Sequence, residues 1–189
     1  MNPPASDGDR RAFEDLAYPL LDSAFRTALR MTGQTSSAED LVQEAFLRAF
    51  RAFNQFERGT NFKAWLFRIL TNVFLNDYRR KGREPQATDF AEVEPADPAT
   101  VGSEFRAEEV EAIRSHLGDE AVRAIDRLPA DFRLPFLLST FEGFSYKEIA
   151  SILDVPIGTV MSRLFRARRL LKMDLKEYAK ASGYLKDRK

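Results

Sequence analysis

The sequence predicts an all-α protein made of two small helical domains joined by an acidic linker. Helical periodicity dominates the chain, and no alternating strand pattern of useful length interrupts it. A length of 189 residues suits one large domain or two small ones. The stretch EPQATDFAEVEPADPAT carries three prolines and five acidic residues with little periodicity, as an extended linker does. We therefore expect one domain over residues 12–84, a linker over 85–102 and a second domain over 103–181.

The charges are segregated along the chain although they sum to zero. The net charge is +6 over residues 58–83, −9 over 84–131 and +7 over 159–189. Two basic blocks on either side of an acidic middle indicate two places for anionic partners. Two solvated helix faces would give the same pattern, so charge alone leaves both interpretations open.

The composition disfavours a membrane protein, a metal protein and an enzyme. No apolar run approaches the roughly 20 residues that span a bilayer, and the N-terminus lacks the layout of a signal peptide. We therefore expect a cytoplasmic protein without direct membrane insertion. The chain has no cysteine, its one histidine is His116, and no carboxylates cluster at metal-ligand spacing. These observations predict no metal, no cofactor and no catalytic residues, against the alternative of an enzyme that acts on nucleic acid.

The segment AEDLVQEAFLRAFRAF is predicted to form a helix with Ser37 as its N-cap. On a helical wheel its apolar face holds Val42, Ala45, Phe46, Ala49, Phe50 and Phe53. The opposite side holds Asp40, Gln43, Glu44, Leu47, Arg48 and Arg51. A leucine within a face of mixed charge indicates a docking surface for another protein. A single exposed leucine is also common, so an ordinary solvated face is the alternative.

A polar loop over residues 57–61 precedes a second helix, predicted over 62–81. Its apolar side is formed by Leu66, Leu70, Val73, Phe74 and Tyr78. Its other side holds Arg68, Asn72, Asn76, Arg79 and Arg80. Amides and arginines along one face, beside a polar loop, suit contact with a nucleic-acid backbone and with unstacked bases. Trp65 has the chemistry to stack on a base, although we favour a place for it in the core.

Residues 143–171 have the pattern of a helix-turn-helix. Ser145 and Glu148 form a capping box at the start of the first helix. The turn falls at Asp154–Val155, and Pro156 suits the first turn of the following helix. The buried stripe of that helix is predicted to hold Val160, Leu164, Ala167 and Leu171.

The opposite face of this second helix predicts reading of the DNA major groove. It holds Thr159, Ser162, Phe165, Arg166 and Arg169. Arginine pairs with guanine edges or phosphates, and an aromatic ring meets a thymine methyl group. Arg163 and Arg168 lie on the flanks, where phosphate contacts or pairs within the protein suit them better. An ordinary charged helical hairpin is the alternative.

Three segments together resemble one known family. DLVQEAFLRAFRAF, FKAWLFRILTNVFLNDYRR and LPADFRLPFLLSTFEGFSYKEIASILDVPIGTVMSRLFRARRLL, in this order, closely resemble the extracytoplasmic-function (ECF) sigma factors of bacterial RNA polymerase. The resemblance covers roughly residues 12–175. It implies a sigma-2 domain, a sigma-4 domain with the helix-turn-helix, and an alternative sigma factor that binds core RNA polymerase and promoter DNA. It also implies an anti-sigma partner.

The resemblance implies a role for each predicted face. The polymerase would dock on Asp40, Gln43, Glu44, Leu47 and Arg48. The loop over 57–61 would capture a flipped base of the −10 element, and the −10 contacts would be Asn61, Lys63, Arg68, Asn72, Asn76, Arg79 and Arg80. The −35 duplex would be read by Thr159, Ser162, Arg163, Phe165, Arg166 and Arg169. The acidic linker would thread toward the RNA exit path.

Two positions depart from the family pattern. Met161 stands where family members often carry a basic residue, and Asp154 stands where a glycine is common in the turn. Aspartate tolerates left-handed backbone geometry better than most residues, so we expect the turn to persist. The alternative to a sigma factor is a stand-alone helix-turn-helix regulator, which leaves the Asp40–Arg51 face and the 57–61 loop unexplained.

Overall fold

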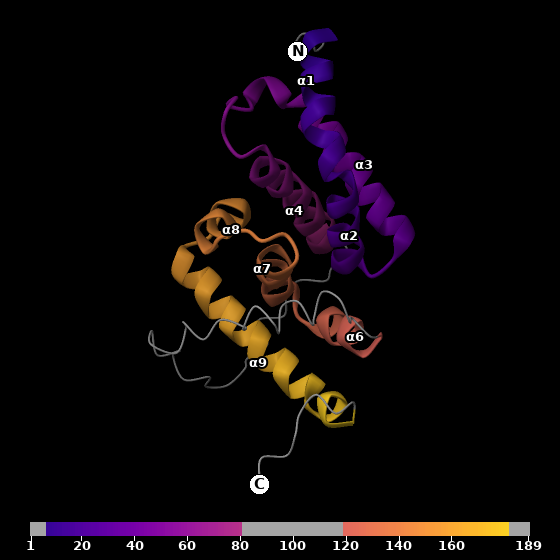
Figure 1. The fold of residues 1–189 in the computed structure, drawn as a ribbon, viewed down its shortest axis with the longest axis vertical. Coiled ribbons are helices and arrows are strands. Elements are labelled where there is room, and N and C mark those ends of the chain that lie inside the picture. Colours follow the sequence, from indigo (N-terminus) through magenta and orange to yellow (C-terminus); the bar gives the residue numbers. More distant parts are fainter. Residues whose placement is uncertain (1–6, 81–118, 182–189) are drawn as a thin grey trace. The chain divides into compact units, whose positions relative to one another are not determined.

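The computed structural model of the chain describes residues 7–80 and 119–181, and every regular element within these ranges is helical (Figure 1). These residues belong to two compact units. The first holds Met1–Glu84 together with Ser151–Asp154, and the second holds the rest of the chain, including most of the predicted helix-turn-helix. The predicted all-α class is therefore confirmed. The predicted linker at 85–102, the start of the second domain at 103 and His116 lie outside the described residues.

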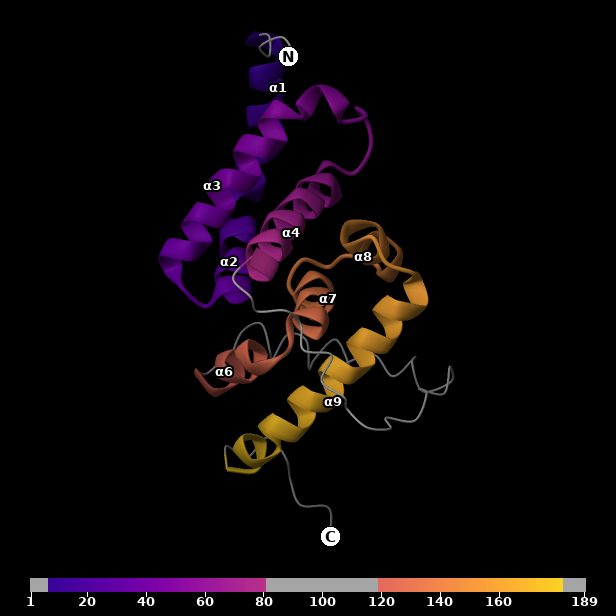
Figure 2. The same cartoon turned by 180° about the vertical axis from the view of Figure 1, so that it is seen from behind.

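The N-terminal unit is built from four helices and two short 3-10 segments. They are α1 (Asp7–Ala17), η1 (Tyr18–Leu20), α2 (Leu21–Thr32), α3 (Thr35–Arg51), η2 (Phe53–Gln55) and α4 (Phe62–Arg80). Helices α2 and α3 pack together as a hairpin, and α4 packs on α3 (Figures 1 and 2). The buried positions of α3 include Val42, Ala45 and Ala49, which confirms the predicted apolar face.

Helix α3 begins earlier than the sequence predicts. Gly33 adopts a left-handed conformation with φ 71°, and its N–H donates to the carbonyl of Leu29 at 2.8 Å. Because this ends α2 sharply, α3 begins at Thr35 with Gln34 as its N-cap residue. The prediction of Ser37 as the N-cap is wrong. Ser37 lies in the first turn, where its hydroxyl donates to Oε1 of Gln34 at 3.4 Å.

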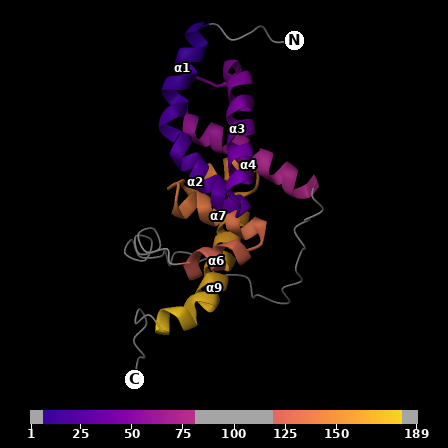
Figure 3. The same cartoon turned by 90° about the vertical axis from the view of Figure 1, so that its right-hand side faces the viewer.

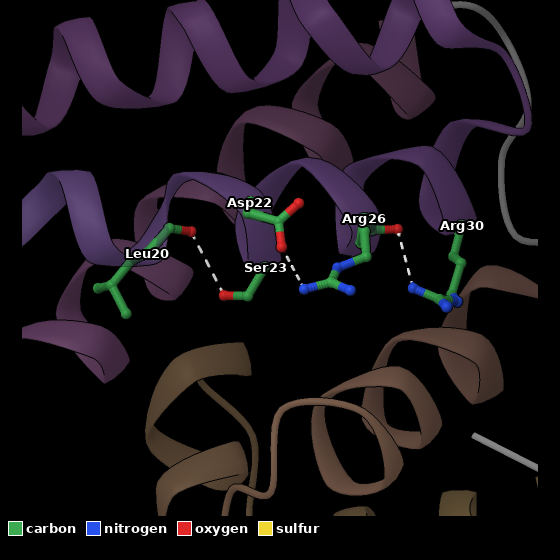
Figure 4. Close-up of polar contacts among 5 residues, drawn as sticks. All are labelled: Leu20, Asp22, Ser23, Arg26 and Arg30. Atoms are coloured by element: carbon green, nitrogen blue, oxygen red, sulfur yellow. Dashed lines mark hydrogen bonds and ion pairs between the residues drawn. The ribbon is translucent and has the colours of Figure 1, made fainter. Parts of the chain in front are cut away.

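The polar side of α2 is held by contacts within the helix (Figure 4). The Ser23 hydroxyl donates to the carbonyl of Leu20 at 3.3 Å. Arg26 pairs with Asp22 one turn before it, and Arg30 donates to the carbonyl of Arg26 at 3.2 Å. Surface pairs at this spacing stabilise a helix by only about 0.2–0.5 kcal/mol each, so the burial of Ala24, Thr27, Ala28 and Met31 fixes α2 in place.

An aromatic cluster joins α1, η2 and α4. Phe62, in the first turn of α4, lies 5.2 Å from Phe56, 6.0 Å from Phe13 and 6.2 Å from Phe53, measured between ring centroids, and all three contacts are edge-to-face. Trp65 lies 5.6 Å from Phe62 and packs against the cluster while staying half-buried. The expectation that Trp65 belongs to the core is therefore met only in part.

The C-terminal unit contains the helices α6 (Asp119–Arg127), α7 (Ala130–Thr140), α8 (Tyr146–Leu153) and α9 (Ile157–Ala181). Helices α6 and α7 both pack against the long α9 (Figure 3). Helix α7 is buried along most of its length, and Phe136, Leu137 and Leu138 have almost no exposed surface. Within the described ranges, no helix combines the length and the apolar character that a membrane crossing requires.

We expect Phe62→Ala to destabilise the N-terminal unit by about 3–5 kcal/mol, because it removes the ring that three other phenylalanines contact. Urea denaturation followed by circular dichroism measures the change, with a separate transition allowed for each unit. Tyr18→Ala is the control, because Tyr18 is 66% exposed and surface substitutions change stability by about 0.5 kcal/mol or less. Equal effects of the two substitutions would contradict the role of the cluster.

Candidate nucleic-acid and protein-binding surfaces

The first helix of the helix-turn-helix begins with the predicted capping box. The backbone N–H of Ser145 donates to Oε2 of Glu148 at 2.8 Å, and the N–H of Glu148 donates to the Ser145 hydroxyl at 3.3 Å. The Ser145 hydroxyl also donates to Oε2 of Glu148 at 2.7 Å. These reciprocal bonds satisfy N–H groups that a helix start otherwise leaves without partners. The prediction is confirmed, and α8 runs from Tyr146 to Leu153.

The turn between α8 and α9 depends on a left-handed residue. Asp154 has φ 54°, and among the described residues it is the single non-glycine residue with positive φ. The N–H of Val155 donates to the carbonyl of Ala150 at 3.1 Å, which is the six-to-one bond of a Schellman helix end. Aspartate in place of glycine thus keeps the turn, as expected. Pro156 directly precedes α9, and its carbonyl accepts from the N–H groups of Thr159 and Val160.

Helix α9 is fixed by a buried stripe and by polar contacts on its flanks. The predicted stripe is confirmed, since Val160, Leu164, Ala167 and Leu171 are all buried. On one flank, Arg163 pairs with Asp131 of α7 at 3.4 Å. On the other flank, Arg168 donates to the Tyr146 hydroxyl of α8 at 3.3 Å. Both flanking arginines therefore make contacts within the protein, and three quarters of the Arg163 side chain is covered.

The outward face of α9 presents polar and basic side chains. Ser162, Arg166 and Arg169 are exposed, whereas Thr159 and Phe165 are half-buried. The Ser162 hydroxyl donates to the carbonyl of Thr159 at 3.0 Å. Within the described part of the chain, Arg166 and Arg169 form no ion pair. The predicted reading face therefore exists as one exposed surface, and Arg163 stands at its edge.

The first turn of α9 holds a feature that the sequence reasoning missed. Ile157 is 43% exposed, although it precedes the buried stripe by less than one turn. Gly158 beside it is also exposed, and a side chain added there would meet no other atom within 4 Å. The signal in the sequence is a large aliphatic residue directly after Pro156, at the start of the helix predicted to read base edges.

The loop over residues 57–61 has a defined conformation. Gly59 has φ 91°, and Thr60 donates to the carbonyl of Glu57 through its hydroxyl at 2.7 Å and its N–H at 3.2 Å. Oδ1 of Asn61 accepts from the N–H of Ala64 at 3.0 Å and so caps α4. Arg58 pairs with Asp9 of α1 at 3.0 Å. The loop is thus tied to both α1 and α4.

A hollow of about 300 Å³ lies between this loop and α1. Its lining combines aromatic rings with a guanidinium group and a hydroxyl group. The lining residues are Ala12, Leu16, Phe53, Phe56, Arg58, Gly59, Thr60 and Phe62. A flat, mostly apolar ring with polar edges has the chemistry that such a hollow accepts.

The outward side of α4 carries the residues predicted to contact DNA. Arg68, Asn72, Asn76 and Arg79 are exposed. In the described ranges, neither of the two arginines forms an ion pair. Lys63 is half-buried, with its ammonium group 5.6 Å from the centre of the Phe67 ring. Arg80 pairs with Asp77 at 2.7 Å. Asn61 is exposed at the N-terminus of the helix, where its side chain caps the first turn.

The outward side of α3 presents a third surface. Asp40, Gln43, Leu47 and Arg48 are exposed, and Leu47 keeps 41% of its surface accessible. Glu44 is half-buried and pairs with Arg48 at 2.6 Å. Because Glu44 and Arg48 pair with each other, Asp40 is, within the part of the chain that the structure describes, the unpaired acidic group of this face and Arg51 its other exposed basic group. Among the described residues, no group of three or more histidine, cysteine or acidic side chains has the arrangement to hold a metal ion.

Two protein families match the chain, one in each unit. Sigma-70 region 2 matches residues 19–84, which include α2, α3 and α4. Sigma-70 region 4 matches residues 119–171, which include α6, α7, α8 and the first part of α9. The outward sides of α3, α4 and α9 therefore lie within the two matched regions, whereas the α1 side of the hollow, with Ala12 and Leu16, precedes the first of them.

Solved structures agree with these matches. The chain is 34% identical to the sigma factor RpoE of Bartonella quintana, solved in complex with the anti-sigma factor NepR, with a TM-score of 0.63 over 86% of this chain and 98% of that one. It is 27% identical to CnrH, solved in complex with the cytosolic domain of CnrY, with a TM-score of 0.60 over 89% and 90% of the two chains.

Curated relatives include the ECF RNA polymerase sigma factor SigE of Mycolicibacterium smegmatis, 38% identical over 87% of this chain and 63% of the relative's length. The chain thus spans less than two thirds of that relative. It spans 86% of two others, each 34% identical over 87% of this chain. These are the RNA polymerase sigma-H factor of Pseudomonas aeruginosa and the ECF RNA polymerase sigma-E factor of Escherichia coli. The chain belongs to the ECF family of RNA polymerase sigma factors.

Proposed function

We propose that the chain is an alternative sigma factor that binds core bacterial RNA polymerase and directs transcription initiation at promoters with specific −10 and −35 elements. The observation that carries this proposal is that each matched region holds a helix with one buried side and one exposed basic side, α4 in the first and α9 in the second. The third surface, on α3, suits a protein partner. The chain acts as a regulator and performs no catalysis of its own.

The polymerase docks on the outward side of α3. An exposed apolar side chain with polar and charged groups around it matches the arrangement of a protein interface, which has an apolar core and a polar rim. Leu47 supplies the apolar contact, while Asp40 and Gln43 beside it stay exposed for polar contacts. The Glu44–Arg48 pair holds both side chains in place along the helix. The five residues Asp40, Gln43, Glu44, Leu47 and Arg48 together form the docking surface.

The −10 element is bound by α4 and the loop before it. Arg68, Asn72, Asn76 and Arg79 follow the opened strand along the helix, with Lys63 and Arg80 at the two ends of this surface. A base extruded from the duplex enters the hollow beside the loop, where Phe56 and Phe62 offer aromatic surface and Arg58 and Thr60 offer donors. Extrusion of a base costs a few kcal/mol, and stacking on aromatic side chains recovers about 1–3 kcal/mol per base.

The −35 element is bound as duplex by the outward face of α9. Arg166 and Arg169 reach base edges or phosphates, and Ser162 and Thr159 contact the same groove from the start of the helix. Phe165 contributes an apolar contact from its half-buried position. Arg163 contacts a phosphate from the edge of the surface while Asp131 orients it.

An anti-sigma protein is a further partner under this proposal. It is supported by the structure of the similar sigma factor RpoE in complex with the anti-sigma factor NepR. A protein that covers α3 or α9 would keep the chain away from polymerase or promoter DNA.

Because the chain binds the polymerase under this proposal, it works in the compartment that holds the polymerase, the bacterial cytoplasm.

We expect Leu47→Asp to weaken binding to purified core polymerase by at least tenfold, because it places an unpaired charge at the centre of the docking surface. Fluorescence anisotropy of the labelled full chain measures the affinity, and circular dichroism checks that both variants stay helical. Val122→Asp is the matched control, because Val122 has the same exposed fraction of 41% and lies on α6. Equal affinities of the two variants would place the docking surface elsewhere.

We expect Arg166→Ala to weaken binding of the holoenzyme to its preferred −35 duplex by about 1–3 kcal/mol and to relax selection at one base position. Arg123→Ala, which removes an exposed arginine from α6, serves as the control for net charge. Competition binding against duplexes with single base changes gives both quantities. If the loss is uniform over all sequences and the salt dependence falls, Arg166 contacts a phosphate and reads no base.

A further inference from the structure

The start of α9 exposes two apolar side chains in adjacent turns. Ile157 is 43% exposed in the first turn, and Met161 follows four residues later, half-buried. Residues at this spacing are neighbours on a helix surface, so the two form a short apolar strip. Neither residue belongs to the buried stripe, which begins with Val160. The reading face proposed above gives neither of them a role.

The strip is held rigidly in this position. The left-handed turn at Asp154 ends α8, and the carbonyl of Pro156 accepts from the N–H groups of Thr159 and Val160. Val160, directly between the two apolar residues in sequence, is completely buried and sets the rotation of the helix. Because a side chain added at Gly158 would meet no atom within 4 Å, the space beside Ile157 is open to a ligand.

The chemistry of the strip differs from that of its surroundings. Exposed residues on another side of the same helix, Ser162, Arg166 and Arg169, offer hydrogen bonds and positive charge. Ile157 offers neither, and the thioether of Met161 is at most a weak acceptor. Arg168, on the side of the helix nearest Met161, donates to the Tyr146 hydroxyl. The strip therefore suits an apolar group of a ligand that the helix as a whole binds through polar contacts.

We infer that Ile157 and Met161 contact thymine methyl groups in the −35 duplex and make this chain select thymine there. The inference rests on the proposed function. Residues near the N-terminus of a recognition helix contact base edges, and the C5-methyl of thymine is the apolar group that the major groove presents.

The experiment replaces thymine by deoxyuridine, which removes the methyl group and keeps every hydrogen-bonding edge. Holoenzyme made from core polymerase and the full chain first selects its preferred −35 sequence from a randomised duplex library. Each thymine in that sequence is then replaced singly, and the dissociation constant is measured. We expect at least one replacement to weaken binding about fourfold, as the loss of one buried methyl group does.

The variants Ile157→Ala and Met161→Ala connect this effect to the two side chains. We expect one of these variants to bind the thymine duplex about as weakly as the natural chain binds the deoxyuridine duplex. The same variant should lose no further affinity when thymine is replaced by deoxyuridine. Val122→Ala, an equally conservative truncation of an exposed aliphatic residue on α6, should keep the full fourfold discrimination. Met161→Arg should lose the discrimination and steepen the salt dependence by about 0.9 in log–log slope, as one added phosphate contact does.

Several outcomes would overturn the inference. They are a selected −35 sequence without thymine, no effect of deoxyuridine on the natural chain, or the same effect in the natural chain and in both alanine variants. The first two need no variant, so misfolding of a variant cannot obscure them. All three leave the proposed function intact. A chain that forms no holoenzyme, or a holoenzyme that selects no −35 sequence, would instead contradict the proposed function itself.

Discussion

Phe62 contacts three other phenylalanine rings, and the placement of the surface that we propose binds the −10 element depends on that packing. The residue ends the loop over 57–61 and begins α4, so burying its ring fixes the loop and the exposed side of the helix together. Edge-to-face aromatic pairs add about 0.5–1.5 kcal/mol each beyond the burial of their area. The Arg58–Asp9 pair is largely exposed and adds little by comparison. The aromatic packing below the loop therefore positions the polar surface that we propose contacts the DNA.

In the C-terminal unit, different contacts fix the exposed side of a helix. A tight turn with Asp154 in a left-handed conformation sets the direction of α9, and the buried stripe from Val160 to Leu171 sets its rotation. Arg163 and Arg168 then fix the two flanks through Asp131 and Tyr146. In both units, one side of a helix is buried so that the opposite side presents arginines and polar groups in a defined order. Under the proposed function, one chain recognises two promoter elements only if both helices keep these exposed side chains in position.

The sequence alone was enough to predict features that depend on local spacing. The capping box at Ser145, the turn at Asp154 and the stripe of α9 follow from residues within one or two turns of each other, and all were confirmed. The start of α3 was missed, because the strength of Gly33 as a helix end outweighed the capping preference of Ser37. Other features could not be predicted from local spacing. The pairs Arg163–Asp131 and Arg58–Asp9 join segments that are distant in the sequence, and the exposure of Ile157 depends on how the whole unit packs.

The central claim is that two separately anchored helices act on one promoter, and run-off transcription tests it most directly. Purified core polymerase would be assayed with and without the full chain, on a template with selected −10 and −35 elements and on templates with either element scrambled. We predict a transcript of defined length that requires the chain and is lost or sharply reduced when either element is scrambled. Transcript levels that stay unchanged without the chain, or after both elements are scrambled, would contradict the claim.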